Sequence, residues 1–136
     1  MSFGTGYQVG DGNLSEIQTG VCPAPQTATS TATLTVDQVT AGILLGSPGS
    51  SAAAYTMPTV ASLEAVLTAS PKVGTCFDLS VVNVDGSGSG VITMTGEGAT
   101  GWTVVGLATV AATAGTAALY RARKTGTGAW SLYRIG

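Results

Sequence analysis

The sequence predicts an all-β fold: a jelly-roll or β-sandwich body with one short helix and an extended N-terminal arm. Small and β-branched residues dominate the 136 residues, with 21 Thr, 20 Gly, 19 Ala and 14 Val. β-branched side chains suit pleated, half-buried surfaces, and glycine supplies the tight turns between short strands. Charged residues make up 9% and apolar residues 44%, so we expect much of the surface to be covered by other copies or another protein.

Residues 1–31 differ from the rest and form the predicted arm. They lack sustained periodicity and cannot bury a core of their own. They nevertheless contain spaced apolar residues that a simple linker would not need: Phe3, Tyr7, Val9, Leu14 and Ile17. We therefore predict an arm that becomes ordered against a partner. The alternative is a disordered terminus.

The predicted body comprises residues 32–136. Its first half combines short strands with a helix. Alternation over residues 33–36 and the apolar run 43–45, closed by a Gly-Ser-Pro-Gly turn, predict two strands. Residues 55–57 precede Pro58. Thr59 is placed to cap a short helix, in which Val60, Leu63 and Leu67 recur at helical spacing. On this helix we expect Glu64 to face solvent.

Residues 75–84 form the clearest core strand, because Phe77, Leu79 and Val81 fall on one face at period two. Cys76 is expected to be a small core residue. A disulfide between Cys22 and Cys76 is a weaker alternative, since two cysteines do not make a disulfide framework. After a Gly/Ser turn at 85–90, further strands are predicted at residues 91–95, 102–105 and 109–111.

The last twenty residues predict a hairpin, with strands 117–124 and 129–135 around a Gly-Thr-Gly loop. A three-residue loop pairs Lys124 with Trp130, Ala122 with Leu132 and Tyr120 with Arg134. One face then carries Tyr120, Ala122, Trp130 and Leu132. A longer loop would shift this register.

Composition argues against most enzymes. The chain has no histidine, which removes Ser-His-Asp and Cys-His catalysis and His-ligated metals. Its seven acidic residues are widely spaced in sequence, and its two glycine clusters, at 86–90 and 96–101, lack the strand–loop–helix order of a phosphate site. We predict no catalytic residues, no metal and no cofactor; a hydrolase using acids or Ser/Thr is a much weaker alternative.

Charge and hydropathy also limit the partners. A net charge of −2 and a pI near 4.7 argue against nucleic-acid binding. No run approaches the roughly 18 apolar residues of a membrane span, and residues 1–10 lack the features of a secretory signal. We therefore predict no nucleic-acid and no membrane partner.

Two groups of side chains near the C-terminus allow more than one interpretation. Arg121, Arg123, Lys124 and Arg134 are four of the five basic residues. They could pair with Asp78, Asp85 or Glu97 of another subunit, lie on a solvated face or, least favoured, contact nucleic acid. The aromatic residues favour core or interface anchors over a sugar-binding platform; these are Trp102, Trp130, Tyr120 and Tyr133.

An ordered set of segments resembles the decoration (cement) proteins of tailed-bacteriophage capsids. The segments are residues 6–13 (GYQVGDGN), 15–18 (SEIQ), 41–46 (AGILLG), 55–59 (YTMPT), 77–83 (FDLSVVN), 101–106 (GWTVVG), 121–126 (RARKTG) and 132–135 (LYRI). The similarity runs over nearly the whole chain, and no single motif is diagnostic.

The resemblance implies a non-enzymatic homotrimer on the capsid exterior, assembled in the host cytoplasm, which bridges major capsid protein subunits and braces the shell. Arg121, Arg123, Tyr133 and Arg134 are then the expected trimer interface. The five arm residues Phe3, Tyr7, Val9, Leu14 and Ile17 are the expected capsid contacts. The alternative is a head-fibre or tail appendage that binds host glycan through Trp102 or Trp130.

Overall fold

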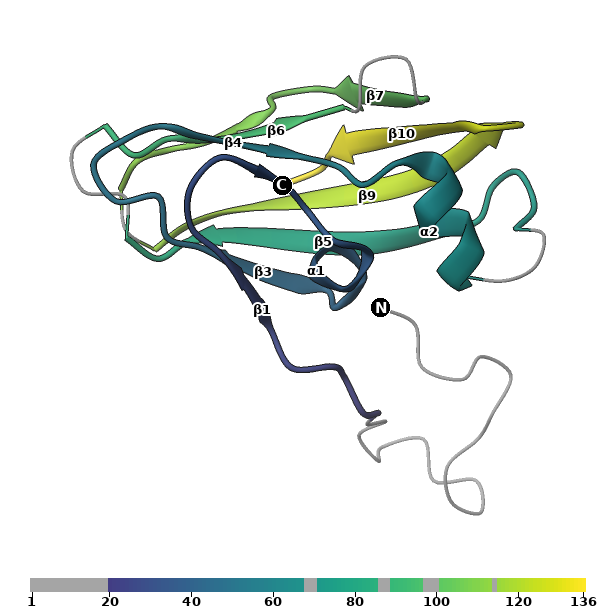
Figure 1. The fold of residues 1–136 in the computed structure, drawn as a ribbon, viewed down its shortest axis with the longest axis horizontal. Helices are drawn as coiled ribbons and strands as arrows, with labels where there is room; N and C mark the ends of the chain where they lie inside the picture. The colour runs from purple at the N-terminus through teal and green to yellow at the C-terminus, as the bar shows by residue number, and fades with distance from the viewer. Residues whose placement is uncertain (1–19, 68–70, 86–88, 97–100, 114) are drawn as a thin grey trace.

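A computed structural model describes residues 20–67, 71–85, 89–96, 101–113 and 115–136 (Figure 1). A six-stranded sheet has the order β1-β3-β5-β9-β10-β7, and a four-stranded sheet has the order β2-β4-β6-β8. The strands are β1 (Gln26–Ala28), β2 (Ala32–Thr33), β3 (Ile43–Gly46), β4 (Ala53–Thr56), β5 (Cys76–Asn83), β6 (Ile92–Thr95), β7 (Trp102–Val105), β8 (Thr109–Val110), β9 (Thr116–Gly126) and β10 (Ala129–Arg134). The predicted all-β class is confirmed.

The chain alternates between the two sheets. From β1 to β9, odd-numbered strands lie in the six-stranded sheet and even-numbered strands in the four-stranded sheet. β1, β3 and β5 are parallel neighbours, and so are β2, β4 and β6. The strands from β1 to β6 therefore wind as a coil of parallel strands. β9 then pairs antiparallel with β5 and β10, β8 antiparallel with β6, and β7 parallel with β10.

The two helices, α1 (Val36–Thr40) and α2 (Val60–Leu67), occupy equivalent connections of this coil. Each follows a strand of the four-stranded sheet and precedes a strand of the six-stranded sheet. Both begin with the same pattern, a threonine and a valine followed three residues later by a buried aliphatic side chain. Gly42 and Gly74 follow the helices with φ of +94° and +96°, a conformation that glycine adopts without steric cost.

The prediction of a single helix was therefore incomplete. α2 was predicted, but residues 33–36 were expected to be a strand, whereas β2 ends at Thr33 and Thr35 caps α1. The Thr35 hydroxyl accepts the Gln38 N–H (3.2 Å), and the Gln38 side chain accepts the Thr35 N–H (2.8 Å). This reciprocal capping box satisfies two backbone donors at the helix start, so local hydrogen bonding overrides the short alternating pattern.

One hydrophobic core lies between the sheets and is closed by residues of the helices. β3 and β5 contribute Leu44, Leu79 and Val81, the hairpin contributes Tyr120, Trp130 and Leu132, and the four-stranded sheet contributes Tyr55, Ile92, Met94 and Val110. Gly46 of β3 faces Ile92 and Tyr55 so closely that a Cβ there would collide with the Ile92 side chain and crowd that of Tyr55. The two sheets are therefore in direct contact, as in a sandwich.

The C-terminal hairpin has the predicted register. Lys124 lies opposite Trp130, Ala122 opposite Leu132 and Tyr120 opposite Arg134. The connection is shorter than expected, because β9 continues to Gly126 and the register shifts at the start of β10. This irregularity keeps the predicted pairs and therefore the predicted faces.

The expectation for Cys76 was wrong. Phe77, Leu79 and Val81 face the core as predicted. Side chains alternate along a strand, so the Cys76 side chain points to the opposite face, where it is exposed.

Candidate functional site

The outer face of the six-stranded sheet is the strongest candidate for an interaction surface. Apart from Ser131, which is buried, its side chains are half-buried or exposed, whereas those of the opposite face contribute to the core. One part of this face is apolar. Ile43, Ser80 and Leu119 lie side by side on adjacent strands, and Leu45, Val82 and Ala117 form the next row. Ile43 is 41% exposed, and Ile135, which follows β10, is 48% exposed.

The remaining part of the outer face is polar. Asp78, Arg121 and Tyr133 are neighbours across β5, β9 and β10. Arg121 donates from Nε to Asp78 Oδ1 (2.8 Å) and from Nη2 to Oδ2 (3.2 Å). This two-point contact lowers the pKa of Asp78 and raises that of Arg121. An ion pair expected between subunits thus lies within one chain.

Three of the four predicted interface residues share this face. Arg123 is exposed beside Ser131, one row from the Arg121–Tyr133 pair. Arg134 is turned the other way, and its guanidinium carbon lies 5.7 Å from the centre of the Tyr120 ring. Its Nη1 donates to the carbonyl oxygens of Thr109 (2.8 Å) and Leu107 (3.2 Å). Arg134 therefore joins β10 to β8 across the two sheets.

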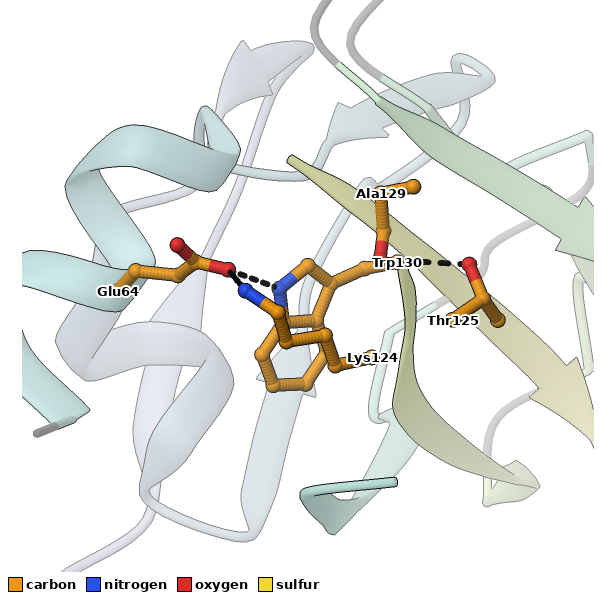
Figure 2. Close-up of polar contacts among 5 residues, drawn as sticks. All are labelled: Glu64, Lys124, Thr125, Ala129 and Trp130. Carbon is orange, nitrogen blue, oxygen red and sulfur yellow. Dashed lines mark hydrogen bonds and ion pairs between the residues drawn. The ribbon is translucent and has the colours of Figure 1, made fainter. Parts of the chain in front are cut away.

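A second polar cluster connects α2 to the hairpin (Figure 2). One oxygen of Glu64, Oε1, accepts hydrogen bonds from Lys124 Nζ and from Trp130 Nε1, the latter at 3.1 Å. Lys124 is only 8% exposed. Contact with Lys124, and then with Trp130, lowers the pKa of Glu64. The carboxylate is thus held as an anion, which suits a structural role better than proton transfer.

The expected solvent-facing position of Glu64 was wrong. The sequence contained a usable signal, because Glu64 lies four residues after Val60 and one after Leu63, both buried. Residues four apart share a helix face. The exposed side of α2 instead carries Ala61, Ala65 and Val66.

The two tryptophans belong to the core. Their ring centres are 5.8 Å apart, and the ring centres of Phe77 and Trp130 are 5.9 Å apart. Trp102 Nε1 donates to the Pro58 carbonyl oxygen (2.7 Å). Because both indoles are buried, the core interpretation is confirmed, and neither ring is available in the chain as a sugar-binding surface.

The five predicted contact residues of the arm, Phe3, Tyr7, Val9, Leu14 and Ile17, lie outside the described residues. Residues 20–25 are exposed, and Val21 is 97% exposed. They lead into β1 at one edge of the six-stranded sheet, and Figure 1 shows them extending away from the body. Residues 26–28 and 32–33 pair with the sheets, so the body begins several residues before position 32.

Comparisons with protein-family models, curated proteins and solved structures find no match. In the described part of the chain, no helix has the length and hydropathy needed to span a membrane. Across the same residues, no group of three or more Cys, Asp or Glu side chains is placed to hold a metal ion.

Proposed function

We propose that this chain is a non-enzymatic structural protein of a tailed-phage virion, which binds the capsid exterior as a homotrimer and braces the shell by bridging major capsid protein subunits. The observation that supports it most is the outer face of the six-stranded sheet, where apolar side chains lie beside an ion pair already satisfied within the chain. A contiguous apolar patch with a polar rim is typical of protein–protein contacts.

A second copy of the chain is the proposed occupant of this face. Arg121 and Asp78 neutralise one another, so a partner need not bring a complementary charge at this point. An apolar, weakly charged surface fits a chain in which 9% of residues are charged. Leu119, Tyr133 and Ile135 would form the centre of the subunit contact, with Arg123 at its rim.

The trimer body is proposed as a two-sheet sandwich rather than a jelly roll. Jelly rolls are built from antiparallel Greek keys, whereas five of the eight pairings among the described strands are parallel.

The part of the predicted arm that precedes β1, residues 1–25, is proposed to carry the contact with the shell. Residues 20–25 leave the body at the β1 edge with their side chains exposed. Three arms per trimer would act together, so contacts that are individually weak would hold the trimer firmly. The apolar anchors Phe3, Tyr7, Val9, Leu14 and Ile17 would contact the major capsid protein.

The test combines sedimentation of the free protein with binding to undecorated shells. Leu119→Glu puts a charge into the proposed subunit contact, while Ala61→Glu puts the same charge on exposed α2 as a control. We expect wild type and A61E to sediment as trimers and decorate shells, and folded L119E to sediment as a monomer with much weaker binding. Deleting residues 2–25 should leave a trimer that no longer binds shells. A monomeric wild-type protein, or full decoration without the arm, would contradict the proposal.

A further inference from the structure

Asn83 is a buried amide at the end of the molecule opposite α2. It is the last residue of β5, and β5 ends on the far side of the body from α2 (Figure 1). Its side chain lies on the inward face of the strand and is fully buried. The other inward residues of β5, Phe77, Leu79 and Val81, are all apolar. An amide at position 83 therefore interrupts the apolar pattern of this strand.

Hydrogen bonds to two backbone carbonyls fix the orientation of this amide. Asn83 Nδ2 donates to the carbonyl oxygen of Gly90 (2.8 Å) and to that of Ala111 (3.0 Å). Carbonyl oxygens only accept hydrogen bonds, so the amide nitrogen and not the amide oxygen must face them. Both protons of Nδ2 are used in this way, and the position of Oδ1 follows from that of Nδ2.

The same residue joins separate segments of the chain. Gly90 precedes β6 and Ala111 follows β8, both strands of the four-stranded sheet, whereas Asn83 belongs to the six-stranded sheet. The Asn83 carbonyl oxygen also accepts the N–H of Gly115 (2.7 Å), which lies just before β9. Asn83 therefore connects the two sheets at this end of the sandwich.

The amide oxygen of Asn83 is buried without a donor. No hydrogen-bond donor among the described residues reaches Oδ1. The large majority of buried polar groups in native proteins have a hydrogen-bond partner, and ordered water commonly serves those that the chain does not satisfy. An acceptor left unpaired in the interior would lose its hydration without compensation. The position of Oδ1 therefore points to a bound donor.

The chemistry around Oδ1 favours water over a cation. A hard cation takes several oxygen ligands, usually with carboxylates among them. The two carbonyl oxygens beside Asn83 already accept the Nδ2 protons. Within the described ranges, no group of three or more Cys, Asp or Glu side chains is placed to hold a metal ion. Water needs only about two to four polar partners, and it both donates and accepts hydrogen bonds.

We propose that Asn83 Oδ1 binds one internal water molecule at this end of the sandwich. The water donates a proton to Oδ1 and makes its other hydrogen bonds with backbone groups of the segments that Asn83 joins. Nδ2 then links the two sheets directly, and Oδ1 links them through the water. The site lies within a single chain, so it does not depend on the trimer of the proposed function.

The first test is a high-resolution crystal structure of the full-length protein. We expect a water oxygen about 2.5–3.0 Å from Asn83 Oδ1, with at least one backbone group as a further partner and no contact with bulk solvent. A structure without a water at this position, or with a backbone N–H of the chain in its place, would overturn the proposal.

The second test counts long-lived internal waters in solution by magnetic relaxation dispersion. Asn83→Leu removes the amide and keeps a side chain of similar size. Tyr120→Phe is the matched control, because it removes a buried hydroxyl that the chain itself satisfies through the Leu107 carbonyl oxygen. We expect N83L to lose one long-lived water while Y120F keeps the wild-type number.

The outcomes of the two tests are independent of one another. A folded N83L variant with the wild-type number of long-lived waters would overturn the proposal, and so would an equal loss in Y120F. The crystal structure needs only the wild-type chain, so it tests the site even where N83L does not fold.

Discussion

The α2 end of the molecule and the segment of residues 26–33, which includes β1 and β2, are held in opposite ways. At α2, side chains make the specific contacts, through the Glu64–Lys124–Trp130 cluster and the Trp102–Pro58 hydrogen bond. Along residues 26–33, most side chains are exposed, and side chains of the body donate hydrogen bonds to the backbone carbonyl oxygens of this segment. Gln38 Nε2 donates to Thr27 O (2.7 Å), and Tyr55 Oη donates to Thr29 O (2.8 Å).

This difference predicts that the two regions tolerate substitutions to different degrees. Backbone carbonyls are the same in every residue, so residues 26–33 should tolerate many side chains, except at Thr31, whose hydroxyl accepts the Ala54 N–H (3.0 Å). The α2 cluster requires a carboxylate, an ammonium and an indole in one arrangement, and should tolerate few. Substitutions at the two regions therefore test the comparison directly.

Trp130→Ala should have the largest effect. It removes a fully buried indole that contacts Trp102 and Phe77 and donates to Glu64. Loss of such a core aromatic costs about 3–5 kcal/mol, a large part of the stability of a small domain. Urea unfolding followed by circular dichroism measures it. A loss below about 1 kcal/mol would show that the α2 end is not specified by its side chains.

Glu64→Gln should have the next largest effect, because it leaves the buried Lys124 ammonium without its anion. We expect a loss of about 1–2 kcal/mol, below that of a fully buried pair because the Glu64 side chain is 25% exposed. The double variant E64Q/K124M removes both charges and should recover most of the loss. A double-mutant cycle from urea midpoints measures the coupling, and additive losses would contradict it.

Acid should destabilise the fold by protonating Glu64 and so weakening its ion pair with Lys124. The folded-state pKa of Glu64 lies below its ordinary value of 4.5, and that of Asp78 lies below 3.8. Both groups therefore stabilise the fold above those values, and the stabilisation is lost as pH falls through the lowered folded-state pKa values. Urea midpoints between pH 7 and pH 2 should fall less for E64Q than for wild type. Equal slopes would show that Glu64 contributes nothing to the acid sensitivity.

Tyr55→Phe should have the smallest effect of the four, about 1 kcal/mol, because it removes one hydroxyl that donates to the segment of residues 26–33. Hydrogen exchange should quicken at residues 27–33 while the amides of β9 keep their protection. Thr27→Ala, at an exposed position of β1, is the matched control and should stay within about 0.5 kcal/mol of wild type. A T27A loss larger than that of Y55F would reverse the comparison.

The sequence predicted elements whose signals are local. The hairpin register followed from a short Gly-containing loop, and the core strand 76–83 followed from period-two alternation. The α1 helix was missed because residues 33–36 alternate over too short a window. The repeated Thr-Val pattern at 35–36 and 59–60 is the signal that would have found it.

Long-range features were not predictable in this way. The alternation of strands between the sheets depends on pairings such as Ile43 with Ser80, which no local pattern encodes. The Glu64–Lys124 contact joins residues 60 positions apart. Arg121, Arg123 and Tyr133 were expected at one interface, and the sheet places them on one face, but their role between subunits stays a prediction.

The alternating path of the chain has a consequence for its synthesis. β9–β10 is the one pairing between consecutive strands among the described residues, and folds dominated by distant pairings form slowly, in milliseconds to seconds. β9 lies between β5 and β10, and β7 pairs with β10. On a translating ribosome, β5 and β7 cannot join in one six-stranded sheet until residues 116–134, which form their partners β9 and β10, have been synthesised. Residues 116–134 are therefore the part that joins strands made before them.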